Sequence, residues 1–507
     1  MSKAAYLTAV LLMTSACATK NAPTPADPVP GAPGLEAAAP EAPFDGPRPQ
    51  PGVVVHLFEW RWDDVATECE AFLGPAGYAA VQVSPVTENS VVEGRPWWEK
   101  YQPVSYVLDN RSGDREAFAD MVSRCAAAGV DVYVDAILNH MTGVYSGVGT
   151  AGSTFGEYSY PGLYEYDDFH HCGLTEDDDI EDFNDPEQVW TCELVNLADL
   201  ASGQDDVRAR LTAHLNDLKS LGVAGFRLDA AKHMHPADVA AVLSGVDDPG
   251  YVYQEVTGGG SLPDWQRPYY NNGRVTEFRF PYALGEVFKR GSLADLHGSG
   301  SIWTRQDFGR TDAVLVFVDN HDLQRSHADD VVTYKDDGLY RLAQVFALAY
   351  PYGRPRVMSS FAFEDGRQGP PSNDDGTVRR VWSGIAPDCG SGRWVCEHRW
   401  PEIVGAMQFN TAVGEVRSVD NWWTDGKDRI AFSRGDRGFV AINRSEAAMS
   451  QALQTGLAPG TYCDRLTRED DGSCAVRVNV AEDGSAVIRL LPMSAVAIDH
   501  QSVVALD

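Results

Sequence analysis

The stretch 130–140, VDVYVDAILNH, sets a β-strand directly before a polar cluster. Its β-branched and aromatic residues are typical of a strand that is covered on both faces, as in a parallel sheet. Asp135, Asn139 and His140 stand at or just beyond its carboxyl end. The same pattern, an apolar run followed by carboxylates, amides or imidazoles, returns further along the chain.

Eight apolar runs alternate with helical segments such as Asp64–Leu73 and Asp114–Ala128. The eight are Val53–Phe58, Tyr78–Ser84, Val130–Leu138, Ala224–Leu228, Tyr251–Val256, the weaker Thr276–Phe280, Ala313–Val318 and Arg356–Met358. Eight alternating β and α units predict an α/β fold built as a closed (β/α)8 TIM barrel. We expect this catalytic barrel to occupy residues 51–414.

Two regions depart from the barrel pattern. Residues 141–200 are rich in Gly, Tyr and Asp and lack periodicity, so we expect an irregular inserted domain after the third strand, domain B. Residues 415–507 contain short runs that alternate with period two between turn residues. This pattern predicts a C-terminal antiparallel β-sandwich domain.

The N-terminus predicts a targeting segment. Residues 1–17 combine Lys3 with a short apolar run, which is typical of a signal peptide and too short to span a bilayer. Cleavage before Cys17 would allow its lipidation and give a cell-surface or outer-membrane lipoprotein, which we favour. Cleavage after Ala18 would instead give a secreted or periplasmic protein. Residues 18–50 are rich in Pro and Ala and predict an extended linker.

Net charge and cysteine number limit the class of partner and the cellular destination of the protein. The formal net charge of −32 argues against a nucleic-acid partner, because a phosphate backbone requires clustered Lys and Arg. Cys17 apart, the remaining cysteines are even in number, as in disulfide-bonded exported proteins, although the sequence permits many pairings. Their order suggests the pairs Cys172–Cys192, Cys389–Cys396, Cys463–Cys474 and, by remainder, Cys69–Cys125.

Carboxylates stand at or just beyond the ends of four predicted strands: Asp135, Asp229, Glu255 and Asp322. In a β/α barrel these ends meet at the face where active sites form. Hydrolysis of a glycosidic bond needs two such groups, one to attack or activate water and one to protonate the leaving oxygen. Each has a structural alternative, such as pairing of Asp229 with Arg227 or helix capping by Asp135. All the alternatives would have to hold together to explain the pattern.

Four short blocks resemble the signature blocks of the α-amylase family of glycoside hydrolases, and look most like the chloride-dependent α-amylases of animals and some bacteria. They are Asp135–His140 (DAILNH), Gly225–His233 (GFRLDAAKH), Glu255 within YQEV, and Phe317–Asp322 (FVDNHD). Longer matches are HLFEWRWDDVATECE, RPWWEKYQPVSY, GRVTEFRF, RVMSS and WVCEHRW. The resemblance covers about residues 52–500.

The resemblance implies a monomeric, retaining, endo-acting α-amylase that hydrolyses internal α-1,4-glucosidic bonds of starch, glycogen and related glucans. It implies Asp229 as the nucleophile, Glu255 as the general acid/base and Asp322 as a third carboxylate that orients the sugar. The implied substrate-binding residues are Trp97, Trp98, Tyr101, Asp135, His140, Arg227, Lys232, His233 and His321.

Two ion sites are also implied by the resemblance. A structural Ca²⁺ would be held by the side chains of Asn139 and Asp199 and by the backbone carbonyls of His233 and Trp190, clamping the insert onto the barrel. An activating chloride would be held by Arg227, Asn320 and Arg356. The alternative is that Arg356 pairs with a carboxylate.

One segment departs from the family pattern. Residues 325–330, RSHADD, lack the glycines of the mobile loop that relatives carry here, so we expect a stiffer loop.

Two other functions remain open. A transglycosylase or an exo-acting hydrolase would use the same scaffold. A surface lipoprotein that binds glucan without cutting it is the third candidate, but such a protein would be expected to lose one of the three carboxylates.

Overall fold

The computed structural model describes residues 52–257, 265–467 and 473–504. The predicted signal peptide, the linker and Cys17 lie outside these residues. Among the described residues, no helix combines the length and the apolar character needed to cross a bilayer.

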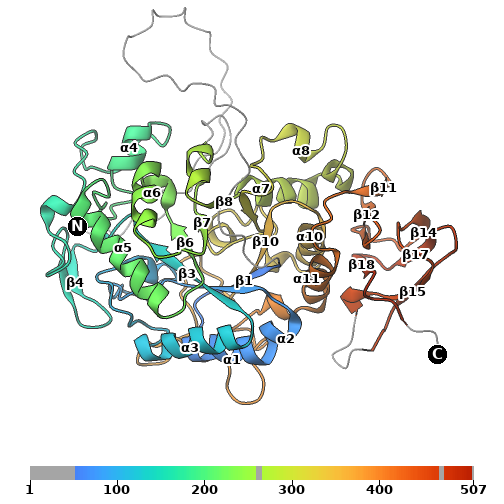
Figure 1. The fold of residues 1–507 in the computed structure, drawn as a ribbon, viewed down its shortest axis with the longest axis horizontal. Helices are drawn as coiled ribbons and strands as arrows, with labels where there is room; N and C mark the ends of the chain where they lie inside the picture. The colour runs from blue at the N-terminus through green and yellow to red at the C-terminus, as the bar shows by residue number, and fades with distance from the viewer. Residues whose placement is uncertain (1–51, 258–264, 468–472, 505–507) are drawn as a thin grey trace, which may run out of the picture.

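A closed barrel of parallel strands forms the centre of the molecule (Figure 1), as the sequence predicts. Its strands are β1 (Val54–Leu57), β2 (Ala80–Val83), β3 (Asp131–Ile137), β6 (Gly225–Asp229), β7 (Tyr251–Gln254), β8 (Arg274–Thr276), β9 (Val314–Val316) and β10 (Arg354–Ser359). The order around the barrel is β1-β10-β9-β8-β7-β6-β3-β2, so the last strand closes on the first.

The sixth predicted strand was placed too far along the chain. The strand β8 ends at Thr276, and helix α7 (Arg279–Gly285) already includes Phe280. The carboxylate of Glu277 accepts hydrogen bonds from the backbone N–H of Arg279 at 3.1 Å and from its Nε at 2.7 Å. Glu277 thereby satisfies a free N–H group of the first helical turn and turns the chain out of the strand.

Helices surround the barrel. The longer ones are α1 (Trp62–Glu68), α3 (Arg115–Ala127), α5 (Asp205–Ser220), α6 (Pro236–Ser244), α7, α10 (Gly338–Ala349) and α11 (Pro401–Val413). Helix α3 shows why they form: Asp114 accepts the N–H of Ala117 at 2.9 Å and caps the first turn. Its buried face includes Phe118, Met121 and Cys125 at helical spacing.

Alternation along the strands builds two layers inside the barrel. An apolar and aromatic layer contains Val54, Ala80, Tyr133, Tyr251 and Leu315, all buried. Two residues further along β1, β2 and β3 come His56, Gln82 and Asp135, and Arg227 lies beside Asp135 on β6; all four are buried. Because residues i and i+2 share a face of a strand, these polar side chains form a second layer toward the carboxyl ends.

The insert after β3 lies at one end of the molecule, around β4 and α4 in Figure 1. It contains β4 (Ser146–Val148), β5 (Thr154–Gly156) and α4 (Pro186–Thr191), with little other regular structure. Its far end returns to the barrel, where His140 forms a backbone bridge with Asp199. The insert therefore begins and ends at the carboxyl end of β3.

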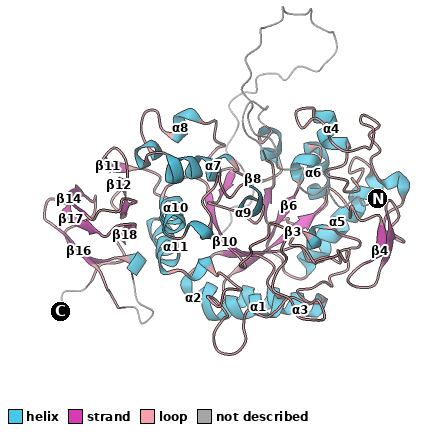
Figure 2. Ribbon diagram, turned by 180° about the vertical axis from the view of Figure 1, so that it is seen from behind, coloured by secondary structure: helices cyan, strands magenta, loops and turns pink. Residues whose placement is uncertain are grey.

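The C-terminal region forms two antiparallel sheets at the opposite end of the molecule (Figures 1 and 2). One contains β11 (Asp420–Thr424), β12 (Arg429–Arg434), β13 (Gly438–Asn443) and β18 (Ser494–Asp499). The other contains β14 (Met449–Gln454), β17 (Ser485–Leu490), β16 (Arg477–Val480) and β15 (Gly460–Cys463). Phe439, Ile488 and Ile498 are among the residues of the apolar core of this region. The predicted antiparallel C-terminal fold is confirmed.

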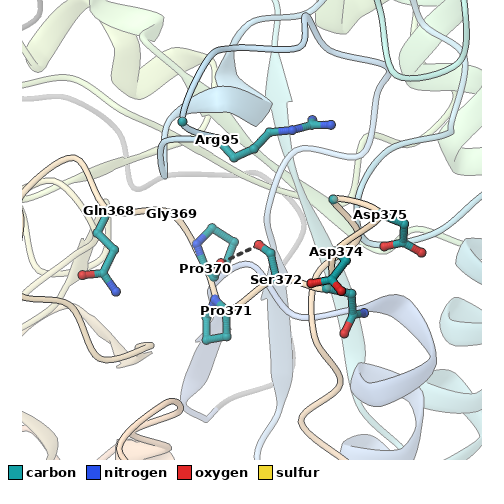
Figure 3. A pocket seen from close by; sticks show the side chains of 11 residues that line it. Arg95, Gln368, Gly369, Pro370, Pro371, Ser372, Asp374 and Asp375 are labelled. Carbon is teal, nitrogen blue, oxygen red and sulfur yellow. Dashed lines mark hydrogen bonds between the residues drawn. The ribbon is translucent and has the colours of Figure 1, made fainter.

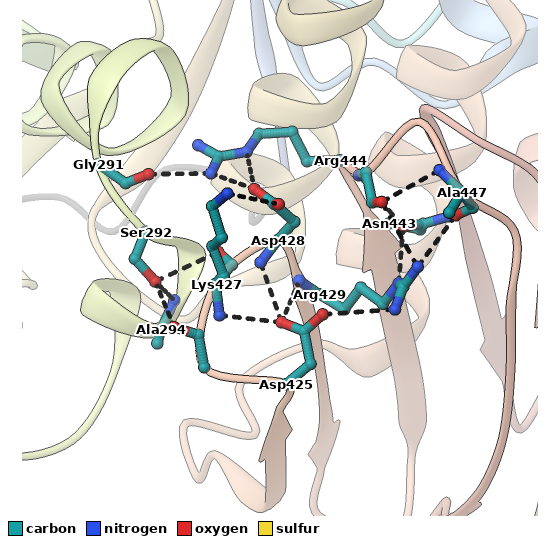
Figure 4. A network of polar contacts seen from close by, with 12 residues as sticks. Gly291, Ser292, Ala294, Asp425, Lys427, Asp428, Arg429, Asn443, Arg444 and Ala447 are labelled. Atoms are coloured by element: carbon teal, nitrogen blue, oxygen red, sulfur yellow. Dashed lines mark hydrogen bonds and ion pairs between the residues drawn. The ribbon is translucent and has the colours of Figure 1, made fainter.

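Arg444 connects these sheets to the barrel (Figure 4). It donates to the carbonyl oxygens of Val287, Phe288 and Gly291 at 2.6–3.0 Å, at the end of the segment η7 (Glu286–Arg290). Asp428 accepts hydrogen bonds from the same guanidinium and fixes its direction.

The four expected disulfides are all present in the structure. They are Cys69–Cys125, Cys172–Cys192, Cys389–Cys396 and Cys463–Cys474. The first joins the segment after α1 to α3, and the second closes a loop within the insert.

Candidate active site

A single guanidinium, that of Arg227, joins three carboxylates at the mouth of the barrel. Its Nη1 lies 2.5 Å from Oδ1 of Asp135 and 2.7 Å from Oδ1 of Asp229, and its Nη2 lies 2.6 Å from Oε1 of Glu255. Burial raises the pKa of Asp229, and the charge of Arg227 acts in the opposite direction. The backbone N–H of Ala230 donates to Oε2 of Glu255 at 3.0 Å, which fixes the second oxygen of that carboxylate.

The fourth carboxylate enters from the end of β9. Oδ2 of Asp322 accepts from Nδ2 of Asn320 at 3.2 Å and lies 3.4 Å from Nε2 of His321. Burial, followed by the charge of Glu255, raises the pKa of Asp322 to about 7. The structure thus brings together the acidic residues that the sequence placed on separate strands.

Aromatic rings surround His321. Tyr101 stacks on its imidazole at 5.3 Å between ring centroids, and Trp97 approaches its ring at 5.5 Å. The hydroxyl of Tyr101 donates to Oδ2 of Asp135 at 2.9 Å, and Tyr101 also offers its backbone oxygen to Nε2 of His140 at 3.2 Å. Trp98, expected beside them, is only 9% exposed, and its ring lies 5.9 Å from the guanidinium of Arg367.

Lys232 and His233 lie in the short helix η5 (Ala231–His233), directly after Asp229. Nζ of Lys232 lies over the rings of Trp265 at 5.2 Å and Phe183 at 5.9 Å. Burial lowers the pKa of Lys232 to about 8. Phe183 and Trp265 were not predicted as site residues, because the sequence does not indicate that the insert and the segment after β7 meet here.

Behind the carboxylates lies a polar floor that the sequence reading also missed. Nη1 of Arg356 donates to Oε1 of Gln82 at 2.7 Å, and Nε2 of Gln82 lies 3.4 Å from both Oδ2 of Asp135 and Nε2 of His56. Burial and then Arg356 hold the pKa of His56 well below its usual range. The sequence does contain an indication of this floor, since His56 and Gln82 are single polar residues inside otherwise apolar strands.

Comparison with known proteins assigns the family. A model of the α-amylase catalytic domain matches residues 71–245, and a model of the α-amylase C-terminal all-beta domain matches residues 422–501. An α-amylase of Tenebrio molitor is 46% identical over 457 residues, with 86% of this chain and 94% of the relative covered. The chain belongs to the α-amylase family.

Other members of the family match over similar lengths. The pancreatic α-amylase of Sus scrofa is 43% identical over 470 residues, covering 85% of this chain and 91% of the relative. The crystal structure of α-amylase I from Eisenia fetida superposes with a TM-score of 0.84 at 37% identity, covering 90% of this chain and 99% of that one. A variant of the same worm enzyme in complex with maltohexaose gives 0.83 at 38%, covering 90% and 99%. This chain is therefore an enzyme of the glycoside hydrolase class.

The residues expected to bind calcium lie where the insert rejoins the barrel. Asn139 and Asp199 are buried, and the N–H of Leu200 donates to the carbonyl of Asn139 at 2.9 Å. Oδ2 of Asp199 lies 2.6 Å from Nδ1 of His170, whereas its buried Oδ1 has no hydrogen-bond partner in the described part of the chain. An unsatisfied buried carboxylate oxygen beside an amide fits a hard cation.

The other donors to such a cation would be neutral. Across residues 52–257, 265–467 and 473–504, no group of three His, Cys, Asp or Glu side chains could hold a metal ion. Calcium accepts amide and backbone carbonyl oxygens, so this set is compatible with it. The imidazole of His233 hydrogen-bonds to the backbone of Val189, next to Trp190, and thus brings helix α4 close to η5.

The residues expected to bind chloride also lie close together. Arg227 and Asn320 belong to the carboxylate cluster, and Arg356 lies in the floor behind it with 3% exposure. Its Nη1 bonds to a neutral amide, and within the described residues its Nε has no partner. A buried, incompletely satisfied guanidinium fits a small anion better than the alternative of a paired carboxylate.

Two further surface features lie near segments that carry site residues. The loop 325–330 is fastened to η7, because Nζ of Lys289 donates to the carbonyl of Ala328 at 2.7 Å and Arg290 pairs with Asp330 at 3.4 Å. A hollow of about 660 Å³ lies between Arg95 and the loop 368–376 (Figure 3). Its lining is polar, Gly or Pro, without the aromatic face that favours stacking of a sugar.

Proposed function

We propose that this family member is an endo-acting α-amylase that hydrolyses internal α-1,4-glucosidic bonds of starch, glycogen and related glucans. The observation that supports it most directly is the contact of Arg227 with both Asp229 and Glu255, which holds two carboxylates at one point of the barrel mouth. Two carboxylates are the chemical requirement for cutting a glycosidic bond.

The mechanism we infer is a retaining double displacement. Asp229 attacks the anomeric carbon while Glu255 gives its proton to the departing glycosidic oxygen. Glu255 then takes a proton from water, which attacks the same carbon and releases the sugar from Asp229. Asp322 and His321 orient the ring that is cut, and Trp97 and Tyr101 offer flat faces to neighbouring glucose units.

The stereochemistry tests this mechanism. Proton NMR of the first product formed from a maltooligosaccharide should show the α-anomer before mutarotation. A first product with the β-configuration would overturn the retaining assignment while leaving hydrolysis itself intact.

The product profile separates the proposal from its rivals. Soluble starch should give mixed short maltooligosaccharides from an early stage, as expected of endo-hydrolysis. A single small product would indicate an exo-acting enzyme, and products longer than a defined donor would indicate a transglycosylase. Binding to starch without release of reducing sugar would favour a binding lipoprotein. The maltohexaose bound by the worm relative supports glucan as the ligand class.

We propose that calcium is structural here. Asn139 and Asp199 would bind it through side-chain oxygens, and His233 and Trp190 through backbone carbonyls. The ion would supply a positive charge that joins the end of the insert to η5, without contact to the bond that is cut.

We propose that chloride activates the enzyme from Arg227, Asn320 and Arg356. The anion would offset the repulsion between two buried guanidinium groups and leave Arg227 free to hold Asp229 and Glu255. Dialysis into chloride-free buffer should lower starch hydrolysis, and sodium chloride should restore it while sodium sulfate at equal ionic strength should not. Activity that is indifferent to chloride would refute this proposal.

Export and anchoring are proposals from the N-terminal sequence. The four disulfides support an oxidising destination. We infer that residues 1–16 are removed and that Cys17 carries the lipid. Residues 18–50 would then be a spacer between the membrane and a monomeric barrel. Fractionation of cells that express Cys17→Ala should then find the enzyme released from the membrane. Equal distribution of both forms would favour cleavage after Ala18.

A further inference from the structure

Arg325 lies inside a cage of aromatic rings beside the active site. It belongs to the short helix α9 (Leu323–Ser326), which begins directly after Asp322. The centre of its guanidinium lies near four ring centroids, at 5.4 Å from Phe58, 5.2 Å from Trp97, 5.0 Å from Phe361 and 4.2 Å from Phe363. These rings come from the end of β1, from the segment before Tyr101 and from the segment after β10.

The hydrogen bonds of Arg325 are unusually few. Its Nη1 donates to the carbonyl oxygen of His321 at 2.7 Å. Its Nε and Nη2 are buried and, within the part of the chain that the structure describes, have no hydrogen-bond partner. The faces of the surrounding rings attract the cation through their quadrupoles. Burial lowers the pKa of Arg325, and the charge of Asp322 is the largest influence in the opposite direction.

The cage shares two rings with the surroundings of His321. Phe58 stacks on the imidazole of His321 at 4.8 Å and Trp97 meets it at 5.5 Å, and both rings also contact Arg325. Any rotation of Phe58 or Trp97 would therefore weaken a cation–π contact and disturb His321. The bond to the His321 carbonyl fixes the backbone of the same residue.

We propose that Arg325 is a positioning residue for glucan binding. Its charge keeps Trp97 and Phe58 in the orientation that presents a sugar-binding face, and its Nη1 holds the backbone that carries His321. Arg325 does not touch the substrate in this role. The inference rests on the proposed function, because it assumes that Trp97 and His321 bind a glucan chain.

A double-mutant cycle with Trp97 tests the proposal. Arg325→Met keeps an apolar side chain of similar length but removes the charge, and we expect it to raise KM for maltoheptaose about tenfold, with kcat changed less than about threefold. Arg325→Lys keeps a cation and should recover most of the loss. In a Trp97→Ala background, Arg325→Met should have little further effect on KM, because the ring through which it acts is gone.

Lys335 provides the matched control. Its Nζ lies 3.7 Å from the centroid of Phe363, so it contacts a ring of the same cage, but its other ring contact is Tyr334. Lys335→Met should therefore leave KM within about twofold of the parent enzyme. Equal losses from Lys335→Met and Arg325→Met would overturn the proposal, since removal of any nearby cation would then suffice.

Two further outcomes are decisive. If Arg325→Met raises KM by the same factor with and without Trp97, Arg325 acts independently of the ring and the proposal is wrong. If Arg325→Met does not fold, Arg325→Gln replaces it in the cycle with the same expectation. Quenching of tryptophan fluorescence by maltoheptaose measures the affinity of each variant in the cycle without relying on hydrolysis. Failure of the wild-type chain to hydrolyse starch would therefore contradict the proposed function. Additive effects of Arg325→Met and Trp97→Ala on binding would contradict only the inference about Arg325.

Discussion

Nη1 of Arg227 lies 2.7 Å from Oδ1 of Asp229, two residues further along the same barrel strand. The spacing places both side chains on the inner face of β6, so the strand itself supplies the contact. The same guanidinium binds Glu255, which directly follows the neighbouring strand β7 and whose backbone N–H donates to the carbonyl oxygen of Leu228 at 2.9 Å. The positions of the two carboxylates relative to one another thus follow from the paired ends of β6 and β7.

Asp229→Asn should abolish turnover while keeping the fold. The amide has nearly the shape of the carboxylate but cannot attack the anomeric carbon, so kcat on starch should fall by at least about 10⁴-fold. Tm should change little, because the neutral amide also relieves the crowding of buried carboxylates. Reducing-sugar assays measure the expected fall in kcat, and calorimetry measures Tm. Substantial residual hydrolysis by a purified variant would show that another group is the nucleophile.

Arg356→Gln should remove the response to chloride. The substitution leaves Arg227 in place but deletes the second buried cation, and with it both the attraction for an anion and the repulsion that an anion would offset. Starch hydrolysis by the variant, measured over a chloride titration, should give a flat curve. Arg367→Gln, at an exposed arginine over Trp98, serves as a control and should give the same chloride response as the parent. A variant at position 356 that still responds to chloride would place the anion elsewhere.

Stability should fall at alkaline pH because of two buried carboxyls behind the site. Oδ1 of Asp319 accepts from the hydroxyl of Tyr340 at 3.0 Å, and Oε2 of Glu397 accepts from the N–H of Ser360 at 2.7 Å. Burial raises the pKa of Asp319 from 3.8 to about 7 and that of Glu397 from 4.5 to about 8. The folded chain therefore binds more protons than the unfolded chain between these limits, and the stabilisation is present at low pH and lost as pH rises through about 8.

Glu397→Gln checks that linkage. The amide cannot ionise, so the decrease in Tm between pH 5.5 and pH 9 should be smaller than in the parent by at least about 2–4 °C. Glu402→Gln, a half-exposed acid on α11, should leave the decrease unchanged. Parallel Tm curves for Glu397→Gln and the parent would show that Glu397 does not titrate in this range.

Gly285→Ala should destabilise the loop beside Asp322. A Cβ at Gly285 would lie 1.8 Å from the carbonyl oxygen of Asp330, so either α7 or the loop must move. We expect a loss of about 1–3 kcal/mol, measured by denaturant unfolding. Gly203→Ala, where the nearest atom is a side-chain oxygen 3.7 Å away, is the matched control. An unchanged unfolding midpoint in Gly285→Ala would mean that the loop moves away from the added Cβ without loss of unfolding free energy.

The strand ends explain how much of the site was predictable. Asp229, Glu255 and Asp322 follow strands whose order fixes their place in the barrel, so their convergence follows from topology alone. Thr276–Phe280 was misplaced because its aromatic residues suit a helix that packs on the barrel as well as a strand. Periodicity cannot separate the two in so short a run.

The cage of Arg325 could not be predicted in this way. Its rings come from segments that are separated by long stretches of chain, and Phe361 and Phe363, just after β10, are apolar residues that the sequence does not distinguish from core residues. Only side-chain packing decides that a charged residue after Asp322 turns toward these rings and not toward solvent. The same holds for Phe183 and Trp265 around Lys232, since the insert has no periodic pattern from which its docking could be read.

Calcium removal should loosen the insert before the barrel. Oδ1 of Asp199 is buried without a hydrogen-bond partner within the described residues, so the proposed calcium ion would add a contact at the edge formed by 139–141 and 198–200. Helix α4 has a second attachment, because Nε1 of Trp190 donates to the hydroxyl of Tyr269 at 3.2 Å. Chelation should therefore free the part of the insert that precedes α4.

Limited proteolysis can report this loosening directly. Trypsin has no site in residues 141–200, which lack Lys and Arg, whereas chymotrypsin can cut at Tyr145 and Tyr166, which are 72% and 58% exposed. Chelator should speed chymotryptic cleavage between 141 and 185 by at least about tenfold, and excess calcium should reverse it, because cleavage tracks the population of the opened insert. Asp199→Ala should be cut at the fast rate with or without calcium. If chelator leaves the cleavage rate unchanged, the Trp190 contact and the disulfide Cys172–Cys192 suffice to hold the insert, and calcium has no structural role here.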